Sequence, residues 1–159
     1  MGKRKLVSKN SLRIQAVGAV DEVNSYLGII SSQNPELKQI KEVQKNLFNV
    51  AAIIAGAPLI FPRTRINRLE KKIDELEKSL PALKNFVFPG GTATSANLFY
   101  ARALVRKAER VIVRLDKKEG LKPEILAYLN RLSDYLFILA REINYQQEVK
   151  EEIWKSSKK

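Results

Sequence analysis

The 159-residue sequence contains no histidine and no cysteine. Their absence excludes Ser-His-Asp and Cys-His nucleophilic centres, imidazole or thiolate zinc sites, CxxC redox pairs and disulfide bonds. A metal ion could bind only through oxygen ligands, which favours Mg²⁺ or Ca²⁺. Because nothing indicates an exported, disulfide-stabilised fold, we expect a cytoplasmic protein.

Long apolar runs are also missing. A membrane-spanning helix needs about 20 apolar residues, whereas the longest apolar stretch, 50–60, is interrupted by Pro58 and followed by Pro62. The basic residues near the N-terminus are not followed by the apolar segment of a signal peptide. The sequence therefore predicts a soluble protein with no membrane association.

Acidic residues are scarce relative to basic ones, with 17 Asp+Glu against 29 Lys+Arg and a net charge of +12. Such an excess indicates either a solvated basic surface or a polyanionic partner: nucleic acid, an acidic membrane or a phosphorylated small molecule. The basic residues are spread over 3–9, 63–84, 102–122 and 155–159. No known nucleic-acid-binding motif accompanies them, so nucleic acid is the partner we favour least.

The 7 glycines and 6 prolines fall at the boundaries of segments in which apolar residues recur every three or four positions. This period is typical of α-helices, and no segment alternates as a half-buried β-strand would. The apolar residues predict five helices, over 17–30, 40–54, 63–78, 101–115 and 125–143.

The predicted fold class is therefore all-α, a single four-helix-bundle-like domain over 1–159. The third helix is short and highly charged, so we expect it on the outside of an antiparallel bundle formed by the other four. A basic N-terminal arm occupies about 1–11. A polar tail at about 155–159 is expected to fray.

Polar residues break the apolar pattern of the fourth predicted helix. Arg102, Arg106, Glu109 and Arg110 share one face beside the apolar stripe. One interpretation is a solvated face with pairs between successive turns, each worth a few tenths of a kcal/mol. The other is a cleft in which arginines receive phosphates, which suits the planar fork of the guanidinium group.

The fifth predicted helix is apolar almost all round, yet it carries a polar line of Asn130, Asp134 and Arg141. Charges in a mostly buried helix must be paired or hydrogen-bonded. An ion pair between Asp134 and an arginine of the fourth helix would satisfy this requirement. A phosphate-receiving cleft between the two helices is the functional alternative.

Two further segments carry open alternatives. Asp21, on the first helix, is either an ordinary surface acid or the partner of an arginine from another helix or another subunit. The loop that contains Phe86, Phe88 and the pair Gly90-Gly91 is a weak phosphate-loop signal. A tight turn explains the two glycines better, and the two phenylalanines could line a flat apolar ligand.

Four of these segments together resemble the PduO-type ATP:cob(I)alamin adenosyltransferases. They are Gly18-Ala-Val-Asp-Glu-Val-Asn-Ser-Tyr-Leu-Gly28, Phe86-Val-Phe-Pro-Gly-Gly-Thr92, Ala101-Arg-Ala-Leu-Val-Arg-Lys-Ala-Glu-Arg110 and Leu129-Asn-Arg-Leu-Ser-Asp-Tyr-Leu-Phe-Ile-Leu-Ala-Arg141. The resemblance runs from about Lys9 to Asn144. It implies a homotrimer of helical bundles with active sites between subunits. In the reaction it implies, Co(I) of cob(I)alamin or a related corrinoid attacks the 5′ carbon of ATP and triphosphate leaves. The corrinoid supplies the nucleophile, and the protein supplies positioning and electrostatics.

The resemblance also implies roles for individual residues. Asp21 would pair with Arg102 across the subunit interface, and these two with Arg106 would form the catalytic set. Phe86 would lie at the lower face of the corrin and help to exclude an axial ligand, so that Co(II) can be reduced to Co(I). The residues implied to bind ATP are Lys9, Arg106, Lys107, Glu109, Arg110 and Asn130. Mg²⁺ would ride on the triphosphate without a dedicated protein site, and the implied protein partners are a Co(II) reductase and a B12-dependent acceptor enzyme.

The sequence departs from the family pattern in three places. The family carries a Thr-Gly-Asp-x-Gly-type segment that wraps ATP, whereas this sequence begins Met1-Gly2-Lys3-Arg4 where that segment should have ended. Either the start lies further upstream or the protein lacks the loop, and the second case would favour a non-catalytic corrinoid- or nucleotide-binding bundle. Phe99 stands where the family commonly has histidine. Lys107 replaces a frequent arginine, which keeps the charge but not the fork.

Overall fold

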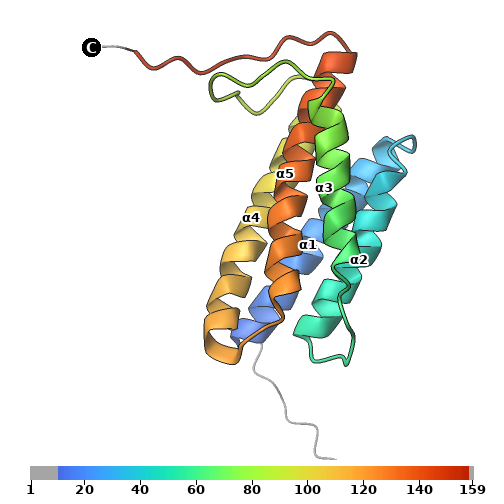
Figure 1. The fold of residues 1–159 in the computed structure, drawn as a ribbon, viewed down its shortest axis with the longest axis vertical. Helices are drawn as coiled ribbons and strands as arrows, with labels where there is room; N and C mark the ends of the chain where they lie inside the picture. The colour runs from blue at the N-terminus through green and yellow to red at the C-terminus, as the bar shows by residue number, and fades with distance from the viewer. Residues whose placement is uncertain (1–10, 158–159) are drawn as a thin grey trace, which may run out of the picture.

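The protein is described by a computed structural model for residues 11–157, which form five α-helices (Figure 1). This confirms the all-α fold class. The helices are α1 (Leu12–Gln33), α2 (Gln39–Ile54), α3 (Thr64–Glu77), α4 (Ala93–Glu119) and α5 (Pro123–Gln146).

Polar caps and turn residues set the ends of these helices. The Ser11 hydroxyl accepts a hydrogen bond from the Ile14 backbone N–H at 3.3 Å, and Thr92 does the same for Ser95 at 3.1 Å. Such caps satisfy backbone donors that the first turn leaves free. They explain why α1 and α4 begin well before the apolar runs that predicted them. Pro123 opens α5, where a missing N–H costs nothing.

The helices pack side by side in the order α2, α1, α4, α5, α3. α1, α3 and α5 run in one direction and α2 and α4 in the other (Figure 1). Neighbouring helices are therefore antiparallel except for α3 and α5, which are parallel. α3 and α4 follow each other in the chain but lie on opposite sides of α5, so the segment between them crosses the end of the bundle before α4 begins.

α3 differs from the sequence-based expectation in one respect. Its charged side is exposed, as predicted, but Ile66, Leu69 and Ile73 are buried in the common core. Glu42 of α2 holds the other edge of α3, accepting from Arg68 at 2.5 Å and from Lys72 at 3.2 Å. α3 therefore closes the bundle between α5 and α2 instead of lying on its surface.

The crossing segment between α3 and α4 meets the C-terminal tail at one end of the bundle (Figure 1). Val87 and Ile153 form an isolated antiparallel bridge, and the part of the chain that the structure describes contains no β-strand. Of the polar tail, 155–157 are exposed and the last two residues lie outside the described part. Within 11–157, no helix has the length and apolar character needed to cross a membrane.

Candidate functional site

The polar face predicted on α4 lines a hollow against α5. Arg106, Glu109, Arg110 and Val113 of α4 and Asn130 of α5 surround a cavity of about 310 Å³. Four of the residues predicted to bind ATP are thus brought together by the packing of two helices. Because both arginines are exposed, their guanidinium groups are available to an anionic ligand.

Asn130 lines both this cavity and a second one. Its Nδ2 donates to Glu109 Oε1 at 3.3 Å, which holds both side chains across the α4–α5 contact. The second cavity has a volume of about 460 Å³. Asn130 and Glu109 line it, and it extends to Arg63 and Arg131. The basic hollow therefore continues along the bundle from α4 toward α3.

Arg102 lies one turn before Arg106 and is held by an aromatic ring. Its guanidinium carbon lies 5.3 Å from the centre of the Phe137 ring, a cation–π contact. Phe137 in turn packs edge-on against Phe99 at 5.8 Å between ring centres. The phenylalanine at position 99 is therefore a buried support for the ring that carries Arg102.

Electrostatics around Arg102 favour an anionic ligand. Burial and the positive charge of Arg106 lower the pKa of Arg102, while Asp134 opposes them. Guanidinium groups stay protonated in proteins, so the lowered pKa of Arg102 reflects first the cost of partly burying its charge and second the repulsion from Arg106. An anion placed between the two arginines would remove part of that cost.

Asp21 and Lys107 lie on other faces. Lys107 pairs with Glu22 of α1 at 2.8 Å and so is turned toward α1. The Asp21 carboxylate is exposed and makes no hydrogen bond or ion pair with any residue that the structure describes. Their predicted roles stay predictions, and Lys9 lies outside the described residues.

The three polar residues predicted to form a line on α5 lie in different environments. Asp134 pairs with Arg131 of its own helix at 2.8 Å. Among the described residues it forms no ion pair with an arginine of α4, the alternative that the sequence left open, although its charge raises the pKa of Arg102. Arg141 is buried at 4% exposure and binds Glu151 and the Pro81 carbonyl, so it does not belong to the phosphate-receiving face. Only Asn130 of this line reaches the α4 hollow.

Phe86 lies far from the arginines within one chain. It belongs to the loop at the end of the bundle where α4 begins, about 3 to 4 helical turns from Arg106. Its ring is 78% exposed and contacts Trp154 edge-on at 6.4 Å between ring centres. A ligand that touches both Phe86 and the arginine face would need a large span or a second subunit.

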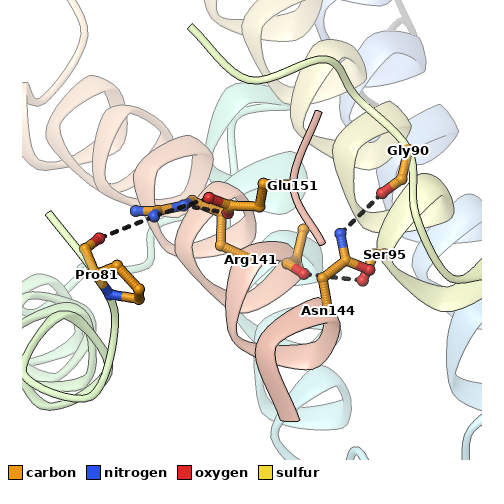
Figure 2. A network of polar contacts seen from close by, with 7 residues as sticks. Pro81, Gly90, Ser95, Arg141, Asn144 and Glu151 are labelled. Carbon is orange, nitrogen blue, oxygen red and sulfur yellow. Dashed lines mark hydrogen bonds and ion pairs between the residues drawn. The ribbon is translucent and has the colours of Figure 1, made fainter. Parts of the chain in front are cut away.

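The glycine pair in this loop makes a tight turn, which confirms the simpler of the two interpretations. Gly91 has φ of 98°, and the Asn144 side chain occupies the space where a Cβ would lie. Asn144 accepts from the Thr92 N–H at 3.0 Å. It also donates to the Gly90 carbonyl at 2.9 Å (Figure 2). Gly91 thus lets the backbone approach the buried Asn144 amide.

Sequence reasoning missed Phe137, Asn144 and Glu151. Phe137 continues the apolar pattern of α5, and nothing in its spacing marks it as the support for Arg102. Asn144 and Glu151 act on segments far apart in the sequence, and no local pattern connects them. A signal existed only for Asn144, as a polar residue at the end of an apolar helix.

Known proteins resemble this chain over most of its length. Residues 1–143 match the family described as "Cobalamin adenosyltransferase". A protein named cobalamin adenosyltransferase from Cupriavidus metallidurans is 36% identical over 151 residues, which cover 91% of this chain and 81% of that protein. A corrinoid adenosyltransferase from Bacillus subtilis is 34% identical, with 86% and 76% covered.

A solved structure has the same fold. It is a variant of a PduO-type ATP:corrinoid adenosyltransferase from Lactobacillus reuteri complexed with cobalamin and ATP. It superposes with a TM-score of 0.90 at 33% identity and covers 94% of this chain and 90% of that one. A second variant of that protein, complexed with ATP, has a TM-score of 0.87 at 34% identity, with the same shares covered.

Proposed function

The chain belongs to the cobalamin adenosyltransferase family, and from this membership and its arginine-lined hollow we propose that it is a corrinoid adenosyltransferase. It transfers the 5′-deoxyadenosyl group of ATP to Co(I) of cob(I)alamin or a related corrinoid. The Co–C5′ bond forms as the C5′–O bond of ATP breaks, and triphosphate leaves with the electron pair of that bond.

The observation that carries this proposal is the cavity lined by Arg106, Glu109, Arg110 and Asn130. Charge-assisted hydrogen bonds from guanidinium to phosphate are about twice as strong as neutral ones. Arg102, held on Phe137, adds a third positive charge one turn away. A triphosphate leaving group accumulates negative charge as the C5′–O bond breaks, so this arrangement stabilises the transition state.

The amino-acid composition agrees with a reaction in which the corrinoid, and not the protein, supplies the nucleophile. Without histidine or cysteine, the chain has no imidazole base and no thiolate nucleophile. The corrinoid supplies the attacking cobalt, and the protein binds and orients both substrates. The proposal includes Mg²⁺ bound to the triphosphate of ATP.

We place the complete site between subunits of a homotrimer. The Asp21 carboxylate is exposed and has no partner among residues 11–157, and Arg102 lies one helical turn before Arg106, which lines the basic hollow. An ion pair between Asp21 of one subunit and Arg102 of the next would close the hollow and fix Arg102. Phe86 would then meet the hollow from a neighbouring chain. A cytoplasmic location, a Co(II) reductase and an acceptor enzyme stay predictions from the sequence.

The test is an anaerobic assay with chemically reduced cob(I)alamin and Mg-ATP, in which Co(I) absorbance gives way to the spectrum of an alkylcobalamin. Arg106→Ala should lower kcat/KM at least about 10-fold, since a charge-assisted phosphate contact is worth about 1.5–3 kcal/mol. Arg114→Ala is the matched control, because Arg114 is also exposed on α4 but lies outside the hollow.

Two results would contradict the proposal. Arg106→Ala with the same turnover as Arg114→Ala would remove the assigned role of the hollow. Corrinoid and ATP binding by the wild-type protein without any turnover would support a non-catalytic binding bundle instead.

A further inference from the structure

The loop that carries Phe86 has little burial of its own. Residues 81–86 are all exposed, as are Phe88, Pro89 and Gly91. Hydrophobic burial therefore cannot hold this loop in one conformation, since that driving force scales with the apolar area removed from water. Its position must come from polar contacts.

α5 fixes the two ends of the loop. Asn144 binds the far end through Gly90 and Thr92, and Arg141 binds the near end, where its Nη2 donates to the Pro81 carbonyl at 3.0 Å. Figure 2 shows both side chains on the last turns of α5, with the loop on either side of them.

The middle of the loop is held by the C-terminal tail. The Phe88 N–H donates to the Glu152 carbonyl at 2.8 Å, and the Trp154 N–H donates to the Phe86 carbonyl at 2.9 Å. The Trp154 ring also contacts the Phe86 ring. We call tail residues 151–154 the strap, because they cross the loop at Phe86.

Arg141 ties the strap to the bundle. Its Nε donates to Glu151 Oε1 at 2.6 Å and its Nη2 to Glu151 Oε2 at 3.2 Å, a bidentate ion pair. The side chain of Arg141 is 5% exposed and that of Glu151 is 22% exposed, so water screens the pair weakly. One buried guanidinium therefore connects α5, the start of the loop and the strap.

We propose that Arg141 and Glu151 are positioning residues for corrinoid binding, because their ion pair holds the strap and the strap holds Phe86 in place. This inference rests on the proposed function for its ligand, but the docking of the strap does not depend on it. Releasing the strap would leave Phe86 to sample many positions, and the affinity for corrinoid falls in proportion to the fraction of competent conformers. ATP affinity should change little, because the strap contacts none of the residues that line the hollow.

The protein carries its own reporter for this test. Trp154 is its only tryptophan, so acrylamide quenching of fluorescence reports directly on the strap. The variant is Glu151→Ala, because Glu151 lies in the tail, outside the five helices. Glu152→Ala is the matched control, since it removes the same charge from the adjacent residue, whose exposed side chain has no partner among residues 11–157.

Glu151→Ala should increase the quenching of Trp154 and raise the KM for corrinoid about 10-fold if the strap then stays docked about a tenth of the time. The KM for ATP should stay within about 2-fold of wild type, because binding energy at the hollow is unchanged. Glu152→Ala should match wild type in all three measurements. Arg141→Lys should fall between them, because an ammonium group keeps the charge but loses the bidentate fork.

Three outcomes would count against the inference or its premise. Unchanged quenching in Glu151→Ala would show that the ion pair does not hold the strap. Increased quenching with an unchanged corrinoid KM would show that the strap does not position Phe86 for the ligand. Absence of corrinoid binding by wild type would overturn the proposed function, and the quenching comparison would still decide whether the pair holds the strap.

Discussion

Gly91 stands at the turn into α4 with φ of 98°, and the Asn144 amide fills the space beside its Cα. Both features require glycine: the positive φ strains any other residue, and a Cβ would overlap a buried side chain. Gly90, one residue earlier, has open space around its Cα. Two neighbouring glycines therefore differ sharply in how strictly the structure requires them.

Gly91→Ala should lower the free energy of unfolding by about 1–3 kcal/mol, through strain and displacement of Asn144. Gly90→Ala should change it by no more than about 0.5 kcal/mol, and both values can be measured by urea denaturation. Equal effects of the two substitutions would show that the turn adapts to a side chain at either position.

At the scale of elements, the sequence predicted which residues share a helix face but not what that face meets. The period of apolar residues was enough for all five helices, because burial of one stripe imposes it. Asn130 and Arg141 lie on one helix at compatible spacing, yet one meets α4 and the other meets the strap. Partners of this kind are set by tertiary packing of distant segments, which local spacing does not encode.

The contact between α2 and α3 is an example with a measurable pH dependence. Hydrogen bonds from Arg68, and then from Lys72, lower the pKa of Glu42 below its ordinary value, against the opposing effect of burial. A carboxyl whose pKa is lower in the folded state stabilises the fold above its unfolded pKa, about 4.3. That contribution is lost as the pH falls through the folded pKa.

Glu42→Gln should therefore lower the free energy of unfolding by roughly 0.5–1 kcal/mol at pH 7, a value limited by the partial exposure of the pair. The difference from wild type should shrink as the pH falls below about 4. Glu36→Gln serves as the control, since Glu36 is exposed in the turn between α1 and α2. A difference that persists at low pH would assign the effect to packing instead of charge.

At the scale of the whole molecule, the candidate site is divided. The arginine hollow lies along the side of the bundle, Phe86 at one end, and Asp21 on the exposed face of α1. The resemblance to a family assigned these residues to one site, and residue spacing could not show that a single chain keeps them apart. Assembly of several chains is the simplest way to unite them.

Light scattering should therefore give a mass near three times the 18.1 kDa of one chain. Asp21→Arg should weaken the assembly and lower turnover at least about 10-fold, because like charges would meet across the interface. Adding Arg102→Asp should restore the assembly by exchanging the two charges. A monomer at all concentrations, or an Asp21→Arg trimer with full turnover, would contradict the shared site.

The packing order of the helices also has a consequence for folding during synthesis. α1 lies between α2 and α4, so its apolar side, with Val20, Leu27 and Ile30, meets α2 early in synthesis and α4 only after α3 and the segment that follows it have been made. The α1–α2 hairpin therefore leaves the ribosome with part of its apolar surface uncovered. α3 must likewise wait for α5, the last helix to emerge. Contacts between sequence-distant helices thus postpone completion of the core until α5 has been made, and a chaperone that binds apolar helices would find exposed apolar surface until then.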